Sequence, residues 1–191
     1  MKMLVTGTSG FVGRAVWQRL NAMCGVQAVG SVRRATAFTN TGALVVAVGD
    51  LSAQTDWSEA LAGVEAVVHT AARVHVMDDT AADPLTEFRR VNVEGTLNLA
   101  RQAVATGVKR FVFLSSIKVN GEATPAPPPS TSSGQAEPLP KRARQKEREK
   151  FSADDVPAPQ DPYGVSKMEA EQGLRHAAHQ LGGGQVLSVT D

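Results

Sequence analysis

The chain has 191 residues, of which 42% are hydrophobic, and a formal net charge of +1 at pH 7. This length predicts one domain with a real core, and so small a net charge indicates no nucleic-acid partner. No stretch approaches the roughly 18 consecutive apolar residues of a membrane helix, and Cys24, the single cysteine, cannot form an internal disulfide. We therefore expect a cytoplasmic protein without a membrane segment.

Short apolar runs alternate with amphipathic stretches along the chain. This pattern predicts strands at 3–5, 26–32, 43–48, 65–69, 110–115 and 185–189, and helices at 11–22, 55–62, 83–106 and 162–181. Asp83 is a plausible N-cap of the third helix, Pro84 suits its first turn, and Gly107 can end it. Such alternation is typical of an α/β protein with a doubly wound, Rossmann-type parallel sheet.

One segment, residues 123–150, departs from this alternation. It is rich in proline and serine, and its last ten residues, KRARQKEREK, hold six basic and two acidic side chains. A segment of this composition cannot bury enough apolar surface to order itself, so we interpret it as a mobile insertion. The functional alternative is a basic tail that docks a partner.

The stretch TGTSGFVG, residues 6–13, follows the first predicted strand and opens the first predicted helix. Gly7 allows a tight turn, Gly10 lets a pyrophosphate approach the backbone, and Gly13 lets helix and strand pack closely. Free N–H groups at the helix start favour a phosphate. The sequence therefore predicts a dinucleotide-binding turn, and the alternative is a tight turn without a ligand. The candidate contacts to the cofactor are Gly7, Ser9, Gly10, Phe11, Val12 and Gly13.

The end of the second predicted strand reads AVGSVRR and contains no acidic residue. A carboxylate at this position bonds the ribose 2′-hydroxyl of NAD, whereas the guanidinium groups of Arg33 and Arg34 would attract the 2′-phosphate of NADP. The sequence therefore favours NADP over NAD. The alternative is that both arginines are merely solvated.

Tyr163 and Lys167 are four residues apart on a predicted helix and so share one face. A nearby ammonium favours the phenolate and would lower the pKa of a tyrosine from its usual value near 10, which makes proton transfer at neutral pH feasible. Ser115 and Ser116 offer hydroxyl groups at the end of the fifth strand, where ligands bind in open α/β sheets. The alternative is an ordinary helix with one aromatic side chain and one surface lysine.

Taken together, the motifs resemble the extended short-chain dehydrogenase/reductases of the NAD-dependent epimerase/dehydratase branch. The matching stretches occur in order: TGTSGFVG at 6–13, DL at 50–51, HTAA at 69–72, NVEGT at 92–96, LSSIKVNG at 114–121 and YGVSK at 163–167.

The resemblance implies a role for each matching position. Asp50 and Leu51 would contact the adenine, and Ala71 and Ala72 would line the cofactor cleft. Asn92 would support the cofactor and active-site geometry from the long helix.

For the reaction itself, the resemblance implies that Ser116 is the catalytic serine and Tyr163 the acid/base. Lys167 would bind the nicotinamide ribose and tune Tyr163. We interpret His69 as a packed histidine without a catalytic role, and His75, His176 and His179 show no arrangement that suggests a metal site.

Within the family, AARVHVM and SSIKVNGE resemble the nucleotide-sugar enzymes of bacterial surface-polysaccharide synthesis, which include UDP-sugar 4-epimerases and reductases of 4-keto-6-deoxy sugars. Either activity would act at carbon 4 of the sugar, and the VRR sequence tilts the interpretation towards a reductase. The resemblance also implies a homodimer through helices 83–106 and 162–181.

Two departures from the family leave other hypotheses open. By comparison with the family, the connection from Ser116 to Tyr163 is longer than usual, and we expect the small C-terminal substrate domain to be largely missing. The chain is therefore an active enzyme, a catalytically impaired dinucleotide-binding fragment, or an interaction module that uses the basic insertion. The missing domain would also leave apolar surface exposed, so we expect a protein prone to association.

Overall fold

The computed structural model describes residues 1–34, 44–74, 83–122, 151, 155–180 and 185–189, with only the backbone described at 179–180 and 185–189. The insertion expected at 123–150 lies outside the described residues, as does His75.

A six-stranded parallel sheet with the strand order β3-β2-β1-β4-β5-β6 forms the centre of the molecule. The strands are β1 (Lys2–Thr6), β2 (Gln27–Val32), β3 (Val45–Ala47), β4 (Ala66–His69), β5 (Arg110–Leu114) and β6 (Gln185–Val189). The strand order reverses between β1 and β4, which is the point where ligands bind in doubly wound sheets. The predicted Rossmann-type fold is confirmed.

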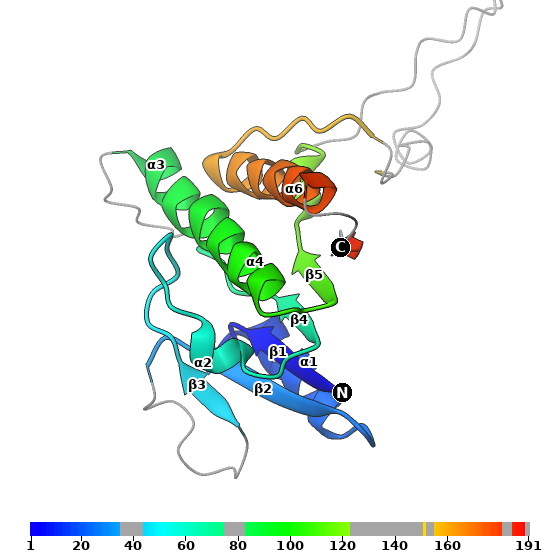
Figure 1. Cartoon of the computed structure of the whole chain (residues 1–191). Coiled ribbons are helices and arrows are strands. Elements are labelled where there is room, and N and C mark those ends of the chain that lie inside the picture. The colour runs from blue at the N-terminus through cyan, green and yellow to red at the C-terminus, as the bar shows by residue number, and fades with distance from the viewer. Residues whose placement is uncertain (35–43, 75–82, 123–150, 152–154, 181–184, 190–191) are drawn as a thin grey trace, which may run out of the picture.

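Helices cover both faces of the sheet (Figure 1). They are α1 (Phe11–Asn21), α2 (Ser58–Leu61), α3 (Pro84–Phe88), α4 (Gly95–Ala105) and α6 (Pro162–Gln180), with a π-helical stretch η2 (Arg89–Glu94) and a short 3₁₀ helix η3 (Ile117–Val119). The larger core packs α2, α4 and α6 against one face through side chains such as Leu4, Leu99 and Leu174. A smaller core packs Trp17 of α1 against Val5 and Ala28 on the other face.

The predicted elements occur in the predicted order, but the bounds of most of them differ by one residue or more. The helix expected at 55–62 is α-helical only at 58–61, because Thr55 turns its hydroxyl back to the Asp50 carbonyl at 2.6 Å. The strand expected at 43–48 is limited to 45–47, the residues that pair with β2. The fifth strand ends at Leu114, so Ser115 and Ser116 stand beyond it.

The helix expected at 83–106 is continuous but not α-helical throughout, because the π-helical stretch η2 separates α3 from α4. Its predicted ends are confirmed. Asp83 accepts a hydrogen bond from the backbone N–H of Thr86, Pro84 lies in the first turn, and Gly107 follows the helix with φ +83°. Single π-helical turns are frequent at functional sites, and this one carries Asn92.

Part of the α1 face of the sheet carries half-buried apolar side chains. Val5 pairs with Val68, and Val68 pairs with Val112, so these residues share one face. Val5 is buried beneath α1, whereas Val68, Val112 and Leu114 are only half-buried. This surface supports the expectation of association, which stays a prediction.

Candidate active site

The glycine turn has a backbone geometry that side chains would prevent. Gly7 has φ +70°, a conformation that glycine adopts without strain. A Cβ at Gly7 would lie 2.9 Å from the Cα of Ala71, and one at Gly13 would lie 2.3 Å from the carbonyl oxygen of Gly7. The turn therefore folds tightly between β1, α1 and the loop after β4, as the sequence predicted.

The start of α1 presents its backbone to solvent. Gly10 is the N-cap and has no side chain to bond the first N–H groups, and Ser9, Gly10, Phe11 and Val12 are all exposed. Unbonded N–H groups and the helix dipole make this end a favourable place for a pyrophosphate. The residues present therefore fit a dinucleotide cofactor.

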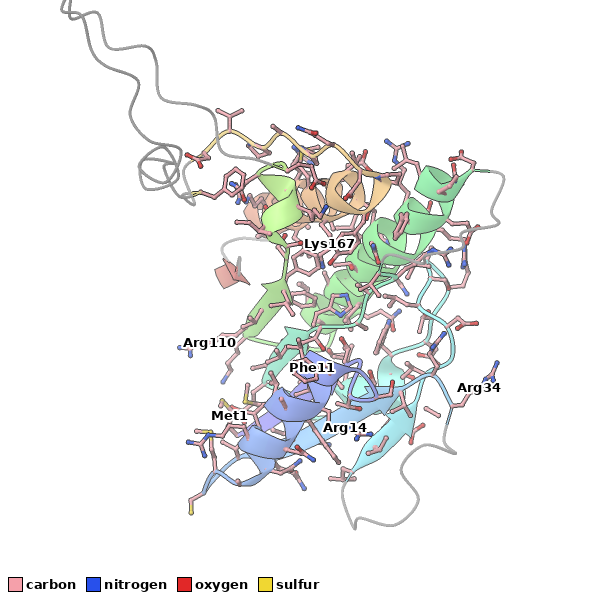
Figure 2. The ribbon with its side chains drawn as sticks, turned by 180° about the vertical axis from the view of Figure 1, so that it is seen from behind. Met1, Phe11, Arg14, Arg34, Arg110 and Lys167 are labelled. Carbon is pink, nitrogen blue, oxygen red and sulfur yellow. The ribbon has the colours of Figure 1, made fainter. Side chains whose placement is uncertain are left out.

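Arg14 is a basic residue at this turn that the sequence analysis did not single out. It lines an open hollow of about 330 Å³ that runs from Ser9 along the first two turns of α1 to Gln18. Figure 2 labels Phe11 and Arg14 on this helix. The available signal was its spacing, because Arg14 follows Gly10 by one helical turn and closes it with an N–H bond to the Gly10 carbonyl at 3.0 Å.

The residues predicted to surround the adenosine lie at the ends of β2 and β3. Arg33 and Arg34 follow β2 directly and are exposed, and Arg34 projects outward (Figure 2). A guanidinium nitrogen of Arg33 lies 4.0 Å from a carboxylate oxygen of Asp50, and both side chains are about four-fifths exposed at 79% and 83%. Leu51 is half-buried against Gly95.

The loop after β4 is fastened to the end of β1. The Thr6 hydroxyl accepts hydrogen bonds from the N–H groups of Thr70 and Ala71, each at 3.1 Å, and the Thr70 hydroxyl donates to the Thr6 carbonyl at 2.6 Å. Ala71 is consequently held beside Gly7, and Ala72 follows it in the same loop. That the two line a cofactor cleft stays a prediction.

Asn92 joins three parts of the site. Its side-chain oxygen accepts from the Arg73 N–H at 2.8 Å, and its Nδ2 donates to the Arg73 carbonyl and to the Ser166 hydroxyl, each at 3.0 Å. Asn92 is buried. It therefore fastens the loop after β4 to α6, and the role in cofactor and active-site support that the resemblance implied stays a prediction.

Ser116 and Tyr163 meet where β5 ends and α6 begins. Ser116 is the N-cap of η3, Tyr163 lies in the first turn of α6, and the Ser116 hydroxyl is near enough to the phenol to lower its pKa. The Tyr163 ring contacts Phe88 edge-on, with 6.1 Å between the ring centroids. Burial raises the pKa of the Tyr163 phenol above its ordinary value, the Ser116 hydroxyl lowers it, and the charge of Asp161 raises it.

Lys167 is buried and points into the sheet rather than towards Tyr163. Its ammonium donates to the Leu114 carbonyl at 2.5 Å and lies 4.0 Å from the centre of the Phe113 ring. Burial lowers the pKa of Lys167 to about 8, although the charge of Glu171 opposes this. The expectation that Lys167 lowers the Tyr163 pKa is therefore wrong for this structure, because the phenol is governed by its burial, Ser116 and Asp161.

His69 is a packed residue, as the sequence analysis interpreted it. Its Nδ1 is 2.7 Å from the Thr6 hydroxyl and its Nε2 is 2.9 Å from the Thr96 hydroxyl, and its side chain is buried. Because the Thr6 oxygen already accepts two N–H bonds, its proton is available to Nδ1 of a neutral imidazole. Burial, with the Lys167 charge, lowers the pKa of His69 to about 3.

Comparison with known proteins identifies the family. The model of the NAD dependent epimerase/dehydratase family matches residues 3–189. The chain belongs to this family. UDP-glucose 4-epimerase of Vibrio cholerae is 42% identical over 172 residues, which cover 90% of this chain and 45% of that protein.

Two solved structures of this family's fold are similar across 100% of the chain. A short-chain dehydrogenase/reductase superfamily protein from Agrobacterium tumefaciens, with bound NAD, is 34% identical with a TM-score of 0.69, and 48% of it is covered. MoeE5 in complex with UDP-glucuronic acid and NAD is 28% identical with a TM-score of 0.71, and 53% of it is covered. The chain thus spans about half the length of these relatives.

Among the residues that the structure describes, no helix is both long enough and apolar enough to cross a bilayer. No three histidine, cysteine, aspartate or glutamate side chains of these residues are grouped as metal ligands would be.

Proposed function

We propose that the chain carries the cofactor-binding and proton-transfer part of an NAD(P)-dependent enzyme that acts at carbon 4 of a nucleotide-linked sugar. The observation that carries this proposal is that one sheet edge brings together the open glycine turn and the neighbouring residues Ser116, at the N-cap of η3, and Tyr163, in the first turn of α6. The 42% identity to a UDP-glucose 4-epimerase supports the sugar and the position of attack.

A bound nicotinamide cofactor would supply the hydride chemistry at the sugar carbon. Tyr163 would donate its proton to the 4-oxygen as a 4-keto sugar is reduced, and its raised pKa keeps the phenol protonated for this step at neutral pH. In the opposite direction, the phenolate would take the proton of the sugar 4-hydroxyl. Ser116 would bond the same oxygen. Lys167 would bind the nicotinamide ribose through the donors that its bond to the Leu114 carbonyl leaves available.

The choice of cofactor rests on Arg33 and Arg34. Both are exposed at the end of β2, where the ribose of the adenosine would lie, and two guanidinium groups favour a 2′-phosphate. Asp50 opposes this in part, since its carboxylate lies 4.0 Å from Arg33. We propose that NADP is preferred, although the similar solved structures bind NAD.

The substrate, the use of the product, the location of the enzyme and its oligomeric state are also proposals. The substrate would be a UDP-linked sugar, the product would serve bacterial surface-polysaccharide synthesis, and the enzyme would work in the cytoplasm. A homodimer would form through helices 83–106 and 162–181. These two helical segments already pack together, and the Arg89 guanidinium bonds the Glu169 carboxylate across them at 2.6 Å and 2.8 Å.

Turnover tests the proposal directly. The protein is incubated with UDP-glucose for epimerisation, and with a UDP-4-keto sugar and NADPH for reduction, with Y163F as the matched variant. We expect turnover in the wild type and a loss of about 100-fold or more in Y163F, with cofactor binding retained. Cofactor binding without turnover in the wild type would instead identify a dinucleotide-binding module.

A further inference from the structure

The turn that carries Ser116 touches the start of α6 through its backbone. The Ser116 hydroxyl accepts a hydrogen bond from the Lys118 N–H at 3.3 Å, which begins η3. A Cβ at Gly164 would lie 2.7 Å from the Lys118 carbonyl oxygen, so glycine allows the turn and the helix to meet. Ser116 and Tyr163 stand on the two sides of this contact.

The Lys118 side chain closes the same contact with charge. Its ammonium lies 3.2 Å from Oδ2 of Asp161 and 2.5 Å from Oε1 of Glu122. The other oxygen of Asp161 accepts from the Gly164 N–H at 2.6 Å, and the Asp161 carbonyl accepts from the Val165 N–H at 3.0 Å. One carboxylate therefore both caps α6 and holds the lysine of the facing turn.

The solvent exposure of Lys118 and Asp161 bears on the role of their ion pair. The side chains of Lys118 and Asp161 are 39% and 26% exposed, and ion pairs so exposed contribute little to stability. They still fix geometry where two backbones meet. We propose that Lys118 is a positioning residue for the reaction above: held by Asp161, it keeps the Ser116 turn against α6 and so sets the contact between Ser116 and Tyr163.

This proposal has an electrostatic consequence at the phenol. The Asp161 charge raises the pKa of Tyr163 and the Ser116 hydroxyl lowers it, so Lys118 acts on both by neutralising Asp161 and by holding the Ser116 turn. The charged groups carried by the segments packed around the phenol include Arg73, Arg89, Lys118, Asp161, Lys167 and Glu169. Of these, the variants described below change Lys118 and Asp161.

The experiment uses the fact that Tyr163 is the only tyrosine of the chain. Its phenol is titrated by ultraviolet absorbance in the wild type, K118M, K118R and E122Q, without cofactor or substrate. We expect K118M to raise the Tyr163 pKa by about one unit. K118R should keep the wild-type value. E122Q, the matched control, should also keep it, because the Lys118 contact to Asp161 remains.

Coupling to Asp161 gives a second test. In a D161N background, whose asparagine can still cap α6, K118M should produce no further shift. If K118M unfolds at alkaline pH, the contact with Ser116 is followed at pH 7 by the NMR chemical shift of the isotope-labelled Tyr163 Cζ. This chemical shift should change in K118M and should have the wild-type value in K118R. An unchanged K118M, an equal shift in E122Q, or no rescue by arginine would overturn the proposal.

The inference rests on the proposed function only for its catalytic meaning. If the wild type turns over a UDP-sugar, K118M should lower kcat about tenfold with KM unchanged, and K118R should restore it. If the wild type has no turnover, the proposed function fails, while the phenol titration still decides whether Lys118 sets the contact between Ser116 and Tyr163.

Discussion

The glycine turn and the proposed catalytic group, Ser116, Tyr163 and Lys167, lie on the same sheet edge but are built differently. The turn is shaped by the backbone of residues 7–13. The proposed catalytic group combines the N-cap of η3 with two residues of α6, and Lys167 faces the Leu114 carbonyl at the end of β5. The shape of the turn is thus encoded locally, whereas the proposed catalytic group depends on contacts between distant segments.

The largest effect is expected from a variant that adds a methyl group inside the glycine turn. G13A places Cβ 2.3 Å from the Gly7 carbonyl oxygen, so we expect at least about 100-fold weaker cofactor binding and a destabilisation of about 1–3 kcal/mol. Binding is measured by calorimetry with NADPH and stability by urea unfolding.

G10A is the matched control within the same turn. Its Cβ would lie 3.3 Å from the Gly7 oxygen, and φ −83° suits alanine. We expect wild-type stability but weakened cofactor binding, because the methyl group stands where the pyrophosphate would approach. Equal binding in both variants and the wild type would show that the turn holds no phosphate.

The buried ammonium of Lys167 tests the proposed catalytic group through the pH dependence of stability. Its pKa is lowered to about 8 in the folded protein, so the unfolded chain binds more protons between pH 8 and its ordinary pKa of 10.5. Stability therefore rises with pH through that window, and the cost of the buried charge is fully present at pH 7. K167M should remove this cost and so raise the free energy of unfolding at pH 7 by up to about 3 kcal/mol, less the contribution of the lost bond to Leu114. The same variant should lose turnover.

Urea unfolding of K167M and of K109M, an exposed lysine, checks this from pH 7 to pH 10. The advantage of K167M over the wild type should shrink as pH rises above 8, and K109M should follow the wild type. A K167M protein that is less stable than the wild type at every pH would contradict the prediction.

His69 links β1 to α4, since it bonds Thr6, the residue before the glycine turn, and Thr96 of α4. Its pKa falls to about 3 on folding, so the unfolded chain binds the extra proton below its ordinary pKa of 6.5, and stability is lost as pH falls through that window. We expect the wild type to lose about 2 kcal/mol between pH 7 and pH 5 through this group. H69Q should remove that part of the slope, and H176Q, which changes an exposed histidine, should retain it.

The smallest expected effect concerns Arg33 and Arg34. Replacing both by alanine should weaken NADPH binding about tenfold and leave NADH binding nearly unchanged. Competition calorimetry with the two cofactors measures the ratio. If NADH binds more tightly than NADPH to the wild type, the proposed preference is wrong and Asp50 decides the cofactor.

Sequence reasoning predicted the features that follow from patterns of neighbouring residues. The alternation of apolar runs predicted the parallel sheet, and the spacing of Gly7, Gly10 and Gly13 predicted the turn. It did not predict the π-helical stretch around Asn92, because the helical periodicity of the sequence does not change there.

The sequence also did not predict the direction in which the Lys167 side chain points. Helical spacing places Lys167 on the face of Tyr163, but the ammonium takes the Leu114 carbonyl, a partner 53 residues away in the chain. The same holds for Lys118 and Asp161, which meet only because η3 packs on α6. Such partners follow from the fold rather than from the local pattern.

Thermal unfolding with NADP, NADPH, NAD and NADH tests the central claim, that the glycine turn binds a dinucleotide. A ligand bound only by the native state stabilises it by about 2.7 kcal/mol at a hundredfold excess over its dissociation constant. We predict stabilisation of the wild type, largest with the NADP pair, and little in G10A. No shift of the wild type with any of the four would contradict the claim and leave the family membership as ancestry alone.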